Sequence, residues 1–138
     1  MNSKQVDSLI LWYEKLNQSN LNQIYDFYAK DAYFRDPFHE YFELESLVKL
    51  YEEMFKKIKN PRFIITKSFF HDEELVLFWD FKFMAFGKEM TIAGNTLFKF
   101  NTEGKVCYHL DYWDSVHELW MNIPIIGQMI KLFYKIVF

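Results

Sequence analysis

Two acidic residues beside histidine and aromatic residues are the candidates for chemistry in this sequence. Asp36 lies in "YFRDPFHEY", directly before Pro37, and Asp111 lies in "HLDYWD", two residues after His109. An ionised carboxylate in apolar surroundings must reach water or a partner, or else its affinity for a proton rises. If the two carboxylates lie close together, one can hold a proton while the other accepts one. Such a pair could move a proton on a carbonyl compound or activate water.

Each of these residues also has a purely structural interpretation. Aspartate before proline often caps a turn, so Asp36 is a turn residue or a general base. Asp111 could equally form a buried pair with His109 or with the backbone. A single histidine is more often a satisfied core residue, and His109 becomes a candidate because it shares a strand face with Asp111.

The strand expected over residues 105–114 has two chemically different faces. Alternation assigns one face to Cys107, His109, Asp111 and Trp113, and the other to Val106, Tyr108, Leu110 and Tyr112. The first set has the apolar walls and convergent polar groups of a ligand pocket, whereas the second is typical of packing. The neighbouring strand alternates Ile92, Gly94, Thr96 and Phe98, and its glycine permits a bend or the close approach of a ligand.

Two other kinds of site receive less support. Cys107 beside His109 could form a nucleophilic pair, but a buried free cysteine is usually a packing residue, and we favour packing. The remaining histidines, His39, His71 and His117, lie at turns or helix starts without the spacing of metal ligands. We therefore expect no metal site.

The periodicity of the chain predicts the elements that position these residues. Apolar residues at helical spacing predict helices from Val6 to Leu16, from an Asn20 cap to Tyr28, and over 44–58. Alternation then predicts strands near 62–70, 74–86, 90–100 and 105–114, joined by short polar turns. A brief helix follows Asp114, and another follows Pro124. This order predicts one α+β domain over 1–138, with three N-terminal helices packed on a curved, mostly antiparallel sheet and a C-terminal helix.

Composition limits the environment and the partners of the domain. With 51% apolar and 21% aromatic residues, the chain can fill a core and also line a cavity. A net charge of −3 and scattered lysines argue against nucleic acid as a partner. The single cysteine, the short apolar run at 9–13 and the lack of an apolar stretch of roughly 20 residues predict a cytoplasmic protein.

The C-terminal helix has only a narrow polar stripe, formed by Gln128, Lys131 and Lys135. A helix of this kind requires burial on most sides. We favour docking on the domain or on a dimer mate, and a helix on a membrane surface is the alternative.

Three segments together carry a family resemblance. "LNQSNLNQIYDFYAKDAYFRDPF", "GNTLFKFNTEGKV" and "HLDYWD" resemble the nuclear transport factor 2-like superfamily, in the branch of ketosteroid isomerase and SnoaL-type polyketide cyclases. The resemblance implies a conical α+β fold, a homodimer, a deep pocket for a small apolar molecule, and no cofactor. It places Asp36 where the isomerases keep their general base. It also puts Trp12 and Thr96 where they keep a tyrosine and a protonated aspartic acid, so these two donors differ from the isomerase pattern.

Two functions from different classes follow. The first is a domain that binds a small apolar ligand, with isomerase-, cyclase- or hydratase-type acid–base catalysis by Asp36, assisted by Asp111 and His109. The residues expected to shape its pocket are Trp12, Trp79, Thr96 and Trp113. The second is a non-catalytic binding or dimerisation module whose cone is filled by its own aromatic side chains. A cavity at Asp36 would favour the first, and a solidly packed cone the second.

Overall fold

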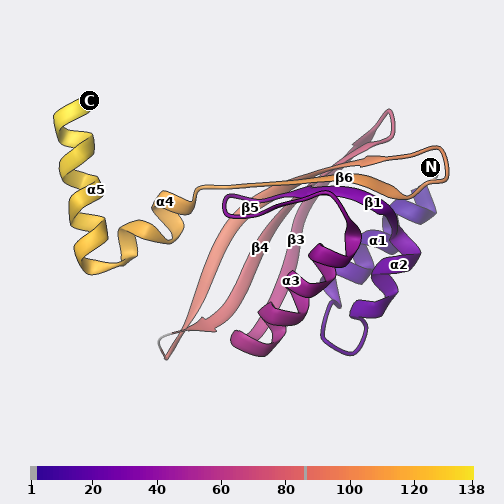
Figure 1. Cartoon of the computed structure of the whole chain (residues 1–138), viewed down its shortest axis with the longest axis horizontal. Helices are drawn as coiled ribbons and strands as arrows, with labels where there is room; N and C mark the ends of the chain where they lie inside the picture. The colour runs from indigo at the N-terminus through magenta and orange to yellow at the C-terminus, as the bar shows by residue number, and fades with distance from the viewer. Residues whose placement is uncertain (1–2, 86) are drawn as a thin grey trace.

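The computed structural model describes residues 3–85 and 87–138 and has the predicted α+β architecture (Figure 1). Its elements are α1 (Ser3–Glu14), η1 (Leu21–Gln23), α2 (Ile24–Phe27), β1 (Tyr28–Arg35), β2 (Glu40–Tyr41), α3 (Leu44–Lys57), β3 (Lys59–His71), β4 (Glu74–Ala85), β5 (Lys88–Phe100), β6 (Val106–Trp113), α4 (Ser115–Glu118), η2 (Trp120–Asn122) and α5 (Pro124–Val137). The third helix and the four long strands form where the periodicity of the sequence predicts them. The end of the predicted strand 74–86 lies outside the described residues.

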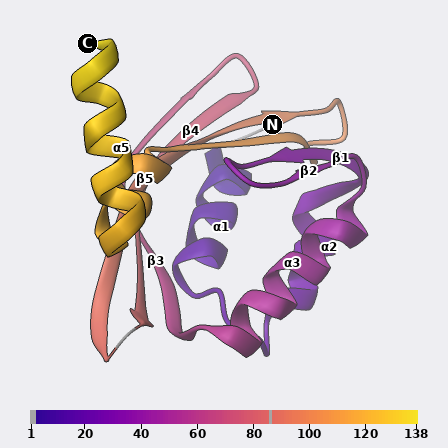
Figure 2. The ribbon, with the colours of Figure 1, turned by 60° about the vertical axis from the view of Figure 1, so that its left-hand side comes forward.

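The described strands form one curved sheet in the order β2-β1-β6-β5-β4-β3. All neighbours pair antiparallel except β1 and β6, which run parallel. Helices α1, α2 and α3 lie on the inner side of the curve, so sheet and helices together form a cone (Figure 2). The tight β3–β4 turn has positive φ at Asp72 and Glu73, as a two-residue hairpin loop requires.

The core lies between the inner face of the sheet and the helices. On β4, Leu75, Leu77 and Trp79 are buried, while Phe78 between them is exposed on the outer face. This alternation of period two allows each long strand to bury one side against the helices. The buried residues of α3 recur at helical spacing on its inner side, and they are Leu44, Leu47, Val48 and Tyr51.

The predicted second helix was largely wrong. The segment forms only a short 3-10 turn and α2, and Tyr28 begins β1, where it pairs with Val106 of β6. Asn20 does not cap this helix, because its side-chain oxygen accepts from the backbone N–H of Asn17. Sheet pairing therefore prevails at Tyr28 over a helical spacing that runs only from Leu21 to Tyr28.

The C-terminal segment projects from the cone. After β6 the chain forms α4 and η2, and α5 stands well apart from the sheet and the N-terminal helices (Figure 1). Gly127 is the only buried residue described in α5, so this helix does not dock on its own domain, and docking on a dimer mate stays a prediction. No helix in the described part of the chain is long and apolar enough to cross a membrane.

Candidate functional site

Asp111 is held on the inner face of the sheet by two neighbours. Nε2 of His109, two residues earlier on β6, lies 2.8 Å from its Oδ1. Thr96, directly opposite on β5, donates to the same oxygen at 2.5 Å, and Thr96 in turn accepts from Nε1 of Trp79 at 2.8 Å. Both hydrogen bonds to Asp111 end on Oδ1, so Oδ2 is the oxygen with acceptor capacity left for a ligand.

Three buried tyrosines continue this network behind His109. The hydroxyl of Tyr28 lies 2.7 Å from Nδ1 of His109 and 2.5 Å from the hydroxyl of Tyr13. Tyr13 also lies 3.3 Å from the hydroxyl of Tyr51. The tyrosines come from α1, β1 and α3, so the network ties both main helices and the edge of the sheet to Asp111.

The tyrosines act as hydrogen-bond donors throughout the ordinary pH range. Burial raises the pKa of Tyr13, Tyr28 and Tyr51 well above the usual value near 10, and the negative charge of Asp111 raises each pKa further. One arrangement satisfies every group when Asp111 is ionised and His109 is neutral. Tyr51 donates to Tyr13, Tyr13 to Tyr28, Tyr28 to Nδ1, and Nε2–H to Asp111.

Asp111 borders a hollow at the mouth of the cone, with a volume of about 370 Å³. Its side chain is 18% exposed, whereas the His109 side chain is 1% exposed, so the carboxylate rather than the imidazole is accessible from the hollow. The walls of the hollow are mostly apolar, and they consist of Phe34, Leu50, Tyr51, Met54, Ile58, Phe63, Trp79, Phe81, Ile92 and Trp113, with Asp36, Glu53, Lys57 and Asp111 as the charged members. Apolar walls with a few convergent polar groups are typical of small-molecule sites.

Asp36 borders the same hollow but is engaged in the turn after β1. Its Oδ1 accepts from the backbone N–H of Phe38 at 2.8 Å and of His39 at 2.6 Å. Nδ1 of His39 lies 3.0 Å from both carboxylate oxygens. Burial is the main cause of the raised pKa of Tyr51, and the negative charges of Asp111 and Asp36 raise this pKa further. Asp36 thus has the turn role, and it also lies at the pocket.

The predicted pocket residues divide into three groups. Trp79 and Trp113 line the hollow. Thr96 lies deeper, beneath Asp111, where it lines a nearly closed space of about 10 Å³. Trp12 does not line the hollow, because α1 turns its indole to the rear of the cone, where Nε1 donates to the backbone oxygen of Asn20 at 3.1 Å. Its placement in the pocket was wrong.

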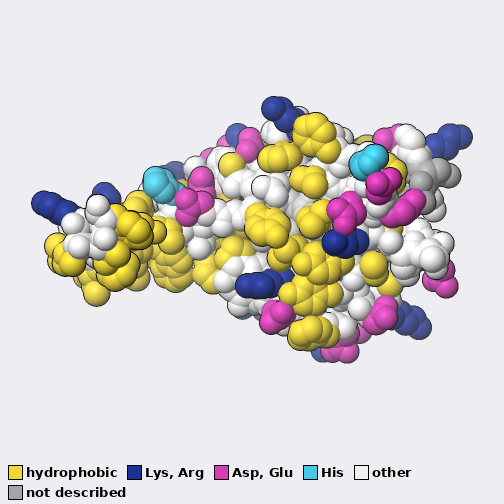
Figure 3. Space-filling view, turned by 90° about the horizontal axis from the view of Figure 1, so that it is seen from above, with side chains coloured by type: hydrophobic (Ala, Val, Ile, Leu, Met, Phe, Trp, Pro, Cys, Tyr) yellow, Lys and Arg dark blue, Asp and Glu magenta, His cyan; other side chains and the backbone are white. Residues whose placement is uncertain are grey.

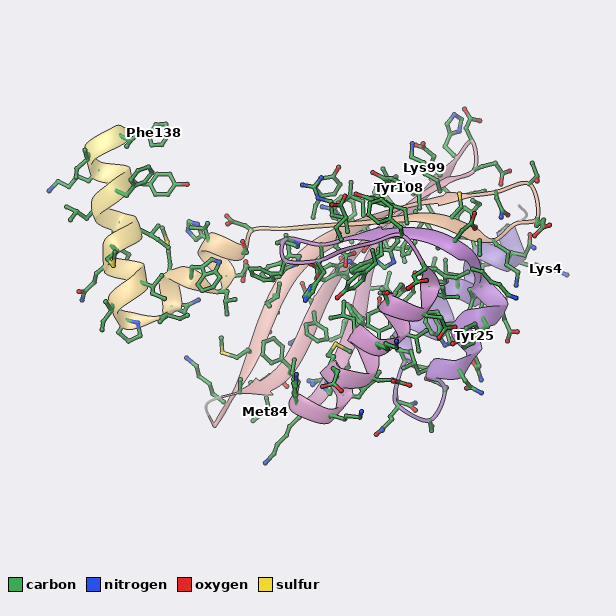
Figure 4. The ribbon with its side chains drawn as sticks, in the orientation of Figure 1. Lys4, Tyr25, Met84, Lys99, Tyr108 and Phe138 are labelled. Atoms are coloured by element: carbon green, nitrogen blue, oxygen red, sulfur yellow. The ribbon has the colours of Figure 1, made fainter. Side chains whose placement is uncertain are left out.

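Cys107 lies in a β-bulge, and its predicted place on the same strand face as His109 was therefore wrong. Lys99 pairs with Tyr108 and Phe100 pairs with Val106, so Cys107 is an extra residue in β6. Alternation is interrupted there, and Val106, assigned by alternation to the face opposite His109, is fully buried in the core. The thiol of Cys107 lies 3.4 Å from the carbonyl oxygen of Lys99, near the outer side of the sheet where Lys99 and Tyr108 lie (Figure 4). A Cys–His pair therefore does not form.

Gly94 has a different use from the one predicted. It pairs with Trp79 across β4 and β5, and an added Cβ would lie 2.5 Å from Cη2 of the Trp79 ring. The close approach is thus made by the indole of this chain rather than by a ligand. Glycine at this position lets Trp79 lie against β5 and reach Thr96 with its N–H.

The hydroxyls of Tyr13, Tyr28 and Tyr51 were missed by sequence reasoning, which assigned these residues only to packing faces. The available signal was chemical, because a buried tyrosine hydroxyl needs a hydrogen-bond partner. Three core-facing tyrosines and one inward histidine in the same sequence indicate a shared polar network. In residues 3–85 and 87–138, no group of three or more His, Cys, Asp or Glu side chains is arranged to hold a metal ion.

Comparison with known proteins identifies the family. Residues 10–109 match the family described as the SnoaL-like domain, and the chain belongs to this family. No curated protein matches the chain.

Solved structures share the fold at low sequence identity. A nuclear transport factor 2-like protein of unknown function from Burkholderia pseudomallei aligns with a TM-score of 0.73 and 14% identity, over 84% of this chain and 95% of that one. A candidate SnoaL-like polyketide cyclase from Shewanella putrefaciens aligns with a TM-score of 0.69 and 18% identity, over 88% of this chain and 100% of that one. A hypothetical protein with a ketosteroid isomerase-like fold from Catenulispora acidiphila, in complex with trimethylamine, aligns with a TM-score of 0.70 and 16% identity. The alignment covers 86% of this chain and 92% of that one.

Proposed function

We propose that this chain is a cytoplasmic domain that binds a small apolar molecule in the hollow at the cone mouth and transfers a proton on it. The observation that carries the proposal is the position of Asp111. Its Oδ1 is fixed by His109 and Thr96, and its side chain is partly exposed in a hollow with mostly apolar walls. A carboxylate held in this way is pre-oriented to accept a proton from a bound molecule.

The roles of the other polar groups follow from their contacts. His109 is a positioning residue, because it is buried and holds Asp111 from behind. Tyr51 borders the hollow, and because its single hydroxyl proton points to Tyr13, its oxygen can accept a hydrogen bond from a ligand. Asp36 contributes a second negative charge at the rim, although its Oδ1 is engaged in the turn. Each of the reactions considered, of the isomerase, cyclase or hydratase type, requires a base such as Asp111 that accepts a proton.

The non-catalytic alternative has one observation in its favour. The deep part of the cone, between Tyr13, Phe98 and Leu77, is almost completely filled by side chains of the chain itself. A binding or dimerisation module would need no more than this packed interior. The volume at the mouth is the reason that we favour a ligand.

Tryptophan indole signals provide a test of ligand binding with an internal control. Trp79 and Trp113 border the hollow, whereas Trp12 lies at the rear with its N–H on Asn20. In a ¹⁵N-labelled sample titrated with small cyclic and aromatic ketones, we expect the indole signals of Trp79 and Trp113 to shift and that of Trp12 to stay. Shifts of all three, or of none, across the whole set of ketones would contradict binding in the hollow.

We further propose that two copies of the chain form a homodimer through the outer face of the sheet. This face exposes several large apolar residues in the described strands, among them Ile64, Phe69, Phe78 and Tyr112. Figure 3 shows hydrophobic side chains gathered over this part of the surface. Light scattering should therefore give twice the chain mass for the parent protein, and the chain mass for Phe78→Lys. A monomeric parent would contradict the homodimer.

A further inference from the structure

The projecting helix α5 exposes nearly all of its apolar side chains. Large apolar side chains along the helix are exposed, with Ile125 73%, Met129 66%, Leu132 60%, Phe133 60% and Ile136 75% exposed. The helix stands apart from the body of the domain in Figure 1, and hydrophobic side chains cover much of the projecting segment in Figure 3. Such a surface needs a partner, because soluble monomers rarely expose large continuous apolar patches.

The polar residues of α5 form one narrow basic stripe. Gln128, Lys131 and Lys135 are spaced by three and four residues, which places them along one side of the helix. Residues 119–138 contain these two lysines and no acidic residue, although the chain as a whole has a net charge of −3. The segment thus has a net charge of +2, opposite in sign to that of the whole chain, and this charge is complementary to an anionic surface.

We propose that α5 docks on an anionic lipid surface, lying in the interface with its apolar side among the acyl chains and Lys131 and Lys135 toward the headgroups. A protein groove normally covers one apolar stripe of a helix, whereas α5 is apolar on all sides but one. A lipid interface surrounds the broad apolar side without a matching shape, and it places both lysines at the level of negative charge. At 14 residues the helix is about 21 Å long, which is too short to cross the hydrocarbon layer but sufficient to lie on it.

The segment that leads to α5 begins at the rim of the hollow. Trp113, at the end of β6, borders the hollow, and the chain continues from it directly into α4, η2 and α5. Phe38, beside Asp36, packs against the rings of both Trp113 and Trp120, with centroid distances of 5.6 Å and 5.9 Å. The root of the projecting segment therefore lies at the rim of the hollow. The segment also lies beyond residues 10–109, the part of the chain that matches the family.

Vesicle flotation of the full chain tests this proposal. We expect the protein to float with vesicles of phosphatidylcholine containing phosphatidylglycerol, and to float much less with phosphatidylcholine alone or at high salt. Replacing both lysines, Lys131→Gln with Lys135→Gln, should weaken the partition about tenfold or more. The apolar double variant Leu132→Ser with Phe133→Ser should abolish it.

The matched control removes two positive charges elsewhere. Lys30 and Lys49 are exposed on the domain, and Lys30→Gln with Lys49→Gln should float as the parent does. Equal flotation with both kinds of vesicle would overturn the anionic specificity. A parent that stays in the aqueous fraction with every vesicle would overturn the proposal, and a dimer dissociated by Leu132→Ser with Phe133→Ser would then show that a second copy covers α5.

Discussion

Nε2 of His109 lies 2.8 Å from Oδ1 of Asp111, two residues further along the same strand. Residues two apart on a strand point to the same face of the sheet, and here the imidazole is buried while the carboxylate stays partly exposed. His109 thus fixes one oxygen of Asp111 and connects it to Tyr28. His109 therefore contributes both to the stability of the core and to the orientation of Asp111 in the candidate site.

Replacing His109 should therefore destabilise the fold. His109→Leu removes both ring nitrogens, which leaves the hydroxyl of Tyr28 and the carboxylate of Asp111 each with one hydrogen bond fewer. We expect the free energy of unfolding to fall by about 2–4 kcal/mol in urea titrations. Cys107→Ser, at the bulge of the same strand, should cost less than about 1 kcal/mol. Similar values for the two variants would contradict a stabilising network.

The buried tyrosines predict a loss of stability at high pH. Their pKa values are raised in the folded state by burial, so the unfolded chain loses these protons first, from about pH 10 upward. The contribution of these tyrosines to the free energy of unfolding is fully present below that pH. It falls as the pH rises, by at most about 1.4 kcal/mol per pH unit for each tyrosine. Urea titrations between pH 9 and 11 should give a steeper fall for the parent than for Tyr13→Phe or Tyr28→Phe. Equal slopes would contradict the raised pKa values.

Much of the fold follows from the sequence because periodicity reports burial directly. Helix α3 and strands β3 to β6 have long, regular patterns, and they form where the patterns predict. The pattern is misleading where a single residue changes the phase, as the bulge at Cys107 does, or where a short helical spacing competes with sheet pairing, as at Tyr28. Neither event has a strong local signal.

The site was predictable only in part. Asp111 and His109 were found because they share one strand face, and Asp36 because proline follows it. The tyrosine hydroxyls were missed because the three tyrosines are far apart in sequence and meet only through packing of α1, β1 and α3. Trp12 was misplaced because adjacent residues of a helix point in different directions, and Tyr13 rather than Trp12 faces the interior network.

A methyl group at Gly94 should disturb the support of Asp111. Because the added Cβ would lie 2.5 Å from the ring of Trp79, Gly94→Ala must displace the indole and weaken its hydrogen bond to Thr96. We expect a loss of about 1–3 kcal/mol in urea unfolding and a changed near-ultraviolet circular dichroism spectrum. In a Trp79→Leu background the same substitution should cost less than about 1 kcal/mol. An equal cost in both backgrounds would exclude the steric cause.

A further prediction concerns the hydrogen bonds that Asp36 accepts in the turn after β1. Asp36→Ala removes the acceptor of two backbone N–H groups and of His39, and it should cost about 1–2 kcal/mol at neutral pH. Asp36→Asn retains one side-chain oxygen and should cost less. Thermal unfolding of the two variants checks the order. A variant as stable as the parent in both cases would show that the turn does not depend on this carboxylate.

Deuterium exchange into a bound ketone is the most direct measurement of the proposed chemistry. Ketones that shift the indole signals of Trp79 and Trp113 would be incubated with the protein in D₂O, and loss of the α-proton followed by NMR. If Asp111 accepts that proton, the parent should accelerate exchange by about 10²–10⁴, and Asp111→Asn should lose this acceleration while still binding the ketone. Asp31→Asn, which removes a negative charge from an exposed position on β1, should exchange as the parent does. Bound ketones whose α-protons exchange at the same rate with the parent and with Asp111→Asn would contradict a catalytic role for Asp111.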